Sequence, residues 1–130
     1  MDDKAGARHL ERVRAIVRAF PRVTERVSHG VPCFFVDDRR PLCYFHDHHN
    51  GDERVTVWCP LPEGFQELFV SSRPDRYFAP PSSASGTFST WLGVVLDAAT
   101  ADDWAEISDT LEQAYRHVAP AHLVALLDQR

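Results

Sequence analysis

Three histidines and two aspartates are crowded into one short segment near the middle of the chain. They are His46, Asp47, His48, His49 and Asp52. Imidazole and carboxylate groups are common metal ligands, so the segment is a candidate metal site. However, it contains Asn50-Gly51, a pair typical of a hairpin turn whose side chains point outward, and it has neither HExxH nor paired-cysteine spacing. We interpret the segment as the polar tip of a hairpin and predict no metal site.

The sequence offers no arrangement typical of covalent catalysis. Each cysteine (Cys33, Cys43 and Cys59) stands in an apolar run, where it would behave as a small buried hydrophobe. There is no Gly-x-Ser-x-Gly elbow and no glycine-rich phosphate loop. We therefore predict no catalytic residues and no cofactor. The odd number of cysteines without a CxxC pair predicts a reducing, cytoplasmic location.

A ligand pocket is suggested by four residues of suitable chemistry: His29, Trp58, Arg76 and Trp91. His29 precedes Gly30, a turn residue that permits close approach of a backbone. Arg76 stands beside two aromatic residues and could present its guanidinium to an anion. The alternative is that the tryptophans are core residues and that Arg76 pairs with Asp75 or Glu67. Both interpretations stay open at this level.

A second candidate site is the arginine-rich face of the first predicted helix, formed by Arg8, Arg12, Arg14 and Arg18. Apolar residues recur at helical spacing from Leu10 to Phe20, and Pro21 ends the helix. Residues 1–60 hold ten Lys and Arg against nine Asp and Glu, whereas residues 61–130 hold four against ten, which gives the net charge of −5. An anionic partner would meet least repulsion at this helix. The same arginines would also suit an ordinary solvated helix face.

The elements that must position these residues follow from periodicity. Residues 23–28, 33–36, 42–45 and 54–59 are predicted strands of an antiparallel meander, separated by turn-forming residues. A short helix over 63–71 precedes Pro80-Pro81, which must end any strand there, in a cis or trans form that the sequence leaves open. The last strand is predicted over 91–96. The longest helix begins at Thr100 with capping-box spacing to Asp103, and a short turn or helix over 122–127 follows it.

Composition predicts one ordinary globular domain over residues 1–130. At 44% hydrophobic and 25% charged residues, the chain resembles an average domain of this length. No apolar run approaches the roughly 20 residues that cross a bilayer, so we expect no membrane association. The N-terminus lacks the pattern of a secretory signal.

Several short motifs follow one another along the chain. They are His29-Gly30-Val31-Pro32, Val57-Trp58-Cys59, Arg76-Tyr77-Phe78-Ala79-Pro80-Pro81, Trp91-Leu92-Gly93-Val94-Val95-Leu96-Asp97, and Ala114-Tyr115 with Ala119-Pro120. In order and spacing they resemble the MmcQ/YjbR-like family of small bacterial proteins, from roughly Leu10 to Pro120. One departure lies at 86–91, where relatives more often place glycine next to tryptophan.

The resemblance implies a two-layer α+β domain of the double-wing, CyaY-like kind. Its antiparallel sheet would follow the order α-β-β-β-(β)-α-β-β-α, with the helices packed on one face. Members are described as DNA-binding, and the architecture is also similar to that of type III secretion chaperones, which bind protein segments. DNA binding is thus the first functional hypothesis, opposed by the pI of 5.7 and by the acidic residues of the longest predicted helix. The alternative is a protein- or small-ligand-binding adaptor without catalytic activity.

Overall fold

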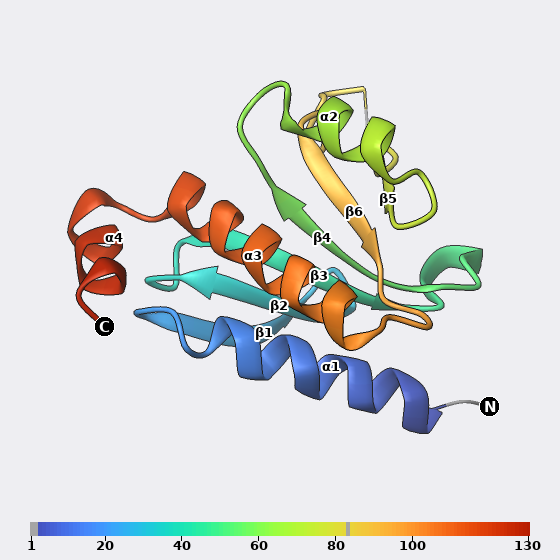
Figure 1. Ribbon diagram of the computed structural model, residues 1–130, viewed down its shortest axis with the longest axis horizontal. Helices are drawn as coiled ribbons and strands as arrows, with labels where there is room; N and C mark the ends of the chain where they lie inside the picture. Colours follow the sequence, from blue (N-terminus) through green and yellow to red (C-terminus); the bar gives the residue numbers. More distant parts are fainter. Residues whose placement is uncertain (1–2, 83) are drawn as a thin grey trace.

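The computed structural model describes residues 3–82 and 84–130 of the chain. Within these residues one antiparallel sheet of six strands, in the order β1-β2-β3-β4-β6-β5, carries the helices on one side (Figure 1). In chain order the elements are α1 (Asp3–Val17), β1 (Val23–Ser28), β2 (Val31–Val36), β3 (Arg40–Asp47), the short 3-10 helix η1 (His49–Gly51), β4 (Val55–Pro60), α2 (Phe65–Ser72), β5 (Tyr77–Phe78), β6 (Trp91–Val95), α3 (Ala101–Val118) and α4 (Ala121–Asp128). The predicted α+β class and order of elements are confirmed.

Two predicted turns are present but shorter than expected, because a strand continues into each of them. Pro32 lies inside β2, opposite Val27 of β1, since a proline near the start of a strand withholds only one donor. His46 is not part of the polar hairpin tip but belongs to β3, where it lies opposite Thr56 of β4. The pairing with β4 therefore continues the strand up to Asp47, beyond the predicted end at Phe45.

The core lies between the sheet and its helices. Because side chains alternate along a strand, Val55, Val57 and Cys59 of β4 face the helices, whereas Thr56 and Trp58 face the other way. An apolar stripe of α3 at helical spacing enters this core, and these members of it are buried: Trp104, Ile107, Leu111, Ala114, Tyr115 and Val118. Figure 1 shows α3 lying along the sheet with α1 beside it.

The N-terminus of α3 is tied to the segment between α2 and β5. Thr100 and Asp103 form the predicted capping box: Asp103 N–H donates to Thr100 Oγ1 at 3.1 Å, and Thr100 N–H donates to Asp103 Oδ2 at 2.9 Å. The backbone donor of Thr100, together with Arg73, lowers the pKa of Asp103 to about 2. Arg73 and Arg76 also donate to the Asp103 carboxylate, at 2.9 and 3.1 Å. The Asp103 carboxylate thus joins the N-terminus of α3 to the segment between α2 and β5.

Pro80 and Pro81 follow β5 closely, as the sequence predicts, and the described peptide bonds are all trans.

None of the helices in the described ranges is both long and apolar enough to cross a membrane.

Candidate ligand-binding site

The face of the sheet opposite the helices, here called the helix-free face, carries a group of aromatic side chains. Tyr44 and His46 come from β3, Trp58 from β4 and Trp91 from β6, and the strand register brings them together because Tyr44 lies opposite Trp58. Phe88, from the segment before β6, packs edge-on against Trp58 and Trp91 with ring centroids 5.3 and 5.0 Å away. Such separations are typical of favourable aromatic pairs.

Two contacts hold the aromatic group in place from outside. The Gln66 side chain of α2 donates to the carbonyls of Ser89 and Trp91, at 3.1 and 2.6 Å, and so ties the end of the Phe88 segment to a helix. At the other end, the Phe78 ring lies directly on Gly93 of β6, at a place where any Cβ would collide with it. Glycine is therefore required at this point of the Trp91–Asp97 motif.

A cavity of about 540 Å³ opens among these rings. It is lined by His29, Tyr44, His46, His49, Trp58, Pro81, Ser82, Thr87 and Phe88. A second hollow of about 430 Å³ shares four of these residues and continues toward Asp52, Arg54 and Phe78. Both volumes fall in the range of small-molecule sites, roughly 300–1,000 Å³, and aromatic walls with few polar groups are typical of such sites.

Two buried polar atoms in the wall of this cavity lack hydrogen-bond partners among the described residues. They are Nδ1 of His46, a residue only 7% exposed, and Nε1 of Trp58. Leaving a buried donor or acceptor unpaired costs about 1–3 kcal/mol. A group that supplied the missing partners would therefore be favoured at this position.

Burial and the neighbouring His49 lower the pKa of His46 to about 4. The imidazole is consequently neutral at pH 7, with one nitrogen as donor and the other as acceptor. Its ring lies against Trp58, with centroids 4.3 Å apart, and stacks on His49 at 5.1 Å. His46 thus presents a neutral polar edge between aromatic surfaces.

The histidine cluster of the sequence divides between two environments. His46 and His49 line the cavity, whereas His48 is exposed and its Nδ1 lies 2.5 Å from Asp47 Oδ1, which raises the pKa of His48. The prediction of outward-pointing side chains therefore holds for His48 and is wrong for His46. No group of three or more metal-ligating side chains occurs within residues 3–82 and 84–130.

The predicted pocket residues are only partly brought together. His29 and Trp58 line the cavity, and Trp91 contacts two lining residues, Tyr44 and Phe88. Arg76 lies elsewhere: its Nη1 donates to the Val95 and Asp97 carbonyls, and its Nη2 donates to Asp103. Its carboxylate partner is thus neither Asp75 nor Glu67. A buried guanidinium needs such partners, and here they come from β6 and α3.

Tyr44, His46 and Phe88 were not among the predicted site residues. Tyr44 and His46 could have been found from the period-two alternation that begins at Leu42 in β3. It places both side chains on one face of the strand and Phe45 on the other. Phe88 follows a serine- and glycine-rich loop, where periodicity carries no information about burial.

The four arginines predicted for the first helix, of which Arg18 directly follows the end of α1, are largely engaged within the chain. Arg14 donates bidentately to Glu25, at 2.8 and 2.7 Å, and Arg18 donates to the same carboxylate at 3.0 Å. These contacts lower the pKa of Glu25, with the Arg14 hydrogen bonds as the largest cause. Arg12 lies over the Trp104 ring, 4.8 Å from its centroid. Among the described residues, Arg8 alone of the four predicted arginines has neither an ion pair nor an aromatic partner.

Comparisons with known proteins agree with this fold. No curated protein matches the sequence. Among solved structures, the chain is similar to the crystal structure of protein DR2400 from Deinococcus radiodurans, which has a DUF419 domain. The two share 13% identity with a TM-score of 0.69, over 87% of this chain and 80% of that one, so the likeness concerns the fold. The model of the YjbR family matches residues 18–117, as the motifs predicted, and the chain therefore belongs to the YjbR family.

Proposed function

We propose that this protein binds a small, planar, uncharged organic molecule on its helix-free face. The observation that carries the proposal is a pair of buried atoms, His46 Nδ1 and Trp58 Nε1, in the wall of one aromatic cavity. Neither has a hydrogen-bond partner in the described part of the chain. The Trp58 indole can only donate, so the ligand would supply an acceptor such as a carbonyl or a ring nitrogen. The neutral His46 ring would exchange a second hydrogen bond with it.

The shape and charge of the cavity favour a planar, neutral ligand. Its walls include the rings of Tyr44, Trp58 and Phe88, which offer stacking and edge-on contacts to a flat molecule. Among the described residues, no Asp, Glu, Lys or Arg lines the larger hollow. In the adjoining one, Asp52 and Arg54 satisfy each other through two hydrogen bonds of 2.9 Å. A charged ligand would therefore lose hydration without gaining a countercharge.

This function is the small-ligand form of the adaptor hypothesis. It has more support than DNA binding, because most of the α1 arginines are already paired with Glu25 or stacked on Trp104. Furthermore, α3 carries Asp102, Asp103, Glu106, Asp109 and Glu112, whose charges would repel a duplex.

Two-dimensional NMR of the ¹⁵N-labelled protein tests the proposal through its indole N–H signals. Nicotinamide and benzamide serve as planar neutral probes, with cyclohexanecarboxamide as the non-planar probe and benzoate as the charged one. We expect the planar amides to shift the Trp58 indole signal in a saturable manner and to leave that of Trp104 unmoved. Stronger binding of the non-planar or charged probe would contradict the proposed ligand class.

Trp58→Phe is the informative variant, since it keeps an aromatic ring and removes the donor. Satisfying a buried donor is worth about 1–3 kcal/mol, so planar amides should bind this variant roughly fivefold to 150-fold more weakly. Trp104→Phe, in the α1–α3 contact, is the matched control and should retain the affinity. Equal affinity of the wild type and Trp58→Phe would mean that the indole N–H does not recognise the ligand.

A further inference from the structure

Helix α2 is rich in apolar residues yet buries none of them fully. Phe65, Leu68, Phe69 and Val70 fall within its eight residues, and none is in the buried class. Leu68 is 69% exposed, although leucine is usually found inside a protein. Phe69 is partly covered, because its ring meets Tyr77 edge-on at 5.1 Å. The side of α2 that carries Leu68 therefore presents an apolar surface to solvent.

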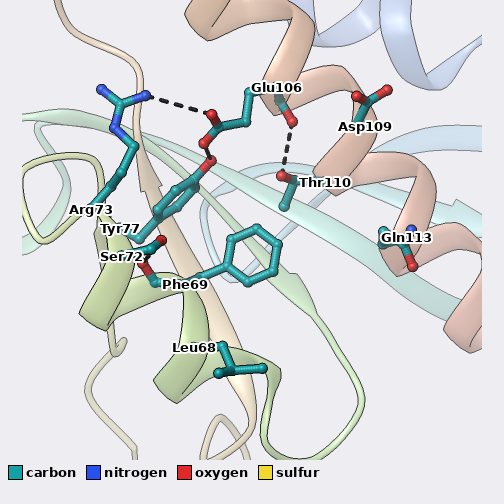
Figure 2. A pocket seen from close by; sticks show the side chains of 9 residues that line it. All are labelled: Leu68, Phe69, Ser72, Arg73, Tyr77, Glu106, Asp109, Thr110 and Gln113. Carbon is teal, nitrogen blue, oxygen red and sulfur yellow. Dashed lines mark hydrogen bonds and ion pairs between the residues drawn. The ribbon is translucent and has the colours of Figure 1, made fainter.

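This surface continues into a groove between α2 and α3, with a volume of about 700 Å³ (Figure 2). Leu68, Phe69 and the Tyr77 ring form an apolar strip along one side. The other side is the polar flank of α3, with Glu106, Asp109, Thr110 and Gln113. Figure 2 shows the Asp109 and Gln113 side chains on α3 across from Leu68 and Phe69 on α2.

The residues around the groove carry a net negative charge. Arg73 is the one cation among the described residues that line the groove. It is shared by Asp75, Asp103 and Glu106, with N–O distances of 3.4, 2.9 and 3.7 Å. Glu106 also accepts a hydrogen bond from the Tyr77 hydroxyl. Asp109 is exposed and has no ion pair within the described part of the chain. Even with Arg76 counted, two arginines face four carboxylates, which leaves this region at −2.

We propose that the groove docks an amphipathic helical segment of a partner protein that carries lysine or arginine beside its apolar residues. The apolar residues of the segment would cover Leu68 and Phe69, and its cations would reach Asp109 and Glu106. This arrangement follows the helix-in-groove mode, in which apolar anchors supply affinity and complementary charges set orientation. Such an interaction is distinct from the proposed ligand cavity, which lies on the other face of the sheet and shares no lining residue with the groove.

The test uses a fluorescein-labelled peptide of about 14 residues, roughly 20 Å of helix, with leucines on one face and arginines flanking them. A second peptide carries glutamates in place of the arginines. Fluorescence anisotropy with the full chain should show saturable binding of the arginine peptide, weakened by about 0.5 M NaCl, which screens exposed charges. The glutamate peptide should not bind.

Four variants locate the site. We expect Leu68→Ser to weaken binding of the arginine peptide about tenfold or more, and Asp109→Asn to weaken it about threefold to tenfold. Leu126→Ser on α4 removes another exposed leucine, and Asp102→Asn removes another exposed acid of α3 outside the groove, so both should bind like the wild type. Circular dichroism of each variant checks that it is folded.

Three results would overturn the proposal. The first is absence of binding by the arginine peptide up to about 1 mM, a dissociation constant that even a weak interaction would reach. The second is equal weakening by Asp102→Asn and Asp109→Asn, since this would indicate general attraction to an acidic protein. The third is a concentration-dependent dimer that Leu68→Ser dissolves, because a second copy of the chain would then occupy the groove.

Discussion

Replacing Gly93 by alanine tests whether the Phe78 ring packs directly against the backbone of β6. This contact lies on the helix-free face, beside the candidate site. A Cβ at this position would lie 2.3 Å from Phe78 Cζ and 2.4 and 2.6 Å from Cε2 and Cε1. Ordinary van der Waals contact begins near 3.4 Å, so the ring would have to move by roughly 1 Å. The Arg54 guanidinium also lies over this ring, 4.2 Å from its centroid, so the movement would disturb a second contact.

The expected cost combines two opposing effects. Overpacking of this kind destabilises a protein by about 1–3 kcal/mol. Alanine regains roughly 0.5–1 kcal/mol over glycine, because it restricts the unfolded chain. We therefore expect Gly93→Ala to lower the free energy of unfolding by about 1–2 kcal/mol and the Tm by about 3–10 °C. Urea and thermal denaturation, followed by circular dichroism, measure both quantities.

A double-mutant cycle isolates the contact. In a Phe78→Ala background the obstructing ring is gone, so Gly93→Ala should become neutral or stabilising by up to about 1 kcal/mol. Whether Gly93→Ala lowers or raises the free energy of unfolding should thus depend on the side chain at position 78. If Gly93→Ala destabilises both backgrounds equally, or leaves the wild type unaffected, the Phe78 ring is not what requires glycine in β6.

Three further predictions concern charge and burial. His46, with its pKa lowered to about 4 by burial, binds a proton less readily in the folded than in the unfolded chain; stability should therefore fall by up to about 3 kcal/mol as the pH drops from 6.5 to 4. This loss, measured by urea denaturation at each pH, should be much smaller in His46→Phe and persist in His48→Gln. In a gel shift at about 50 mM salt, we expect no saturable binding of duplex DNA; binding that weakens steeply with salt would restore the DNA hypothesis. Burial raises the pKa of the thiols of Cys33, Cys43 and Cys59. Ellman's reagent should therefore label the native chain slowly and the denatured chain fully. Rapid labelling of the native chain would contradict the burial of these cysteines.

Local patterns sufficed for the order of elements and for the part of the core that α3 supplies. Two features of α3 were predictable: its apolar stripe from Trp104 to Val118 and the Thr100–Asp103 capping box. Both depend only on spacing within one helix. The end of β3 was not, because turn-forming residues follow His46 and only the pairing with β4 extends the strand. The same extension changes His46 from an exposed turn residue into a buried member of the cavity wall.

The candidate site depends on contacts between distant parts of the chain. The sequence singled out His29, Trp58 and Trp91 by residue type, and the order of strands in the sheet places them around Tyr44 and Phe88. Arg76 and the arginines of α1 show the converse: their types suited anion binding, but Asp103 and Glu25 engage several of them. Periodicity records which face of an element is apolar. Whether a charge is free or a polar atom unpaired is settled only when elements far apart in the chain pack together.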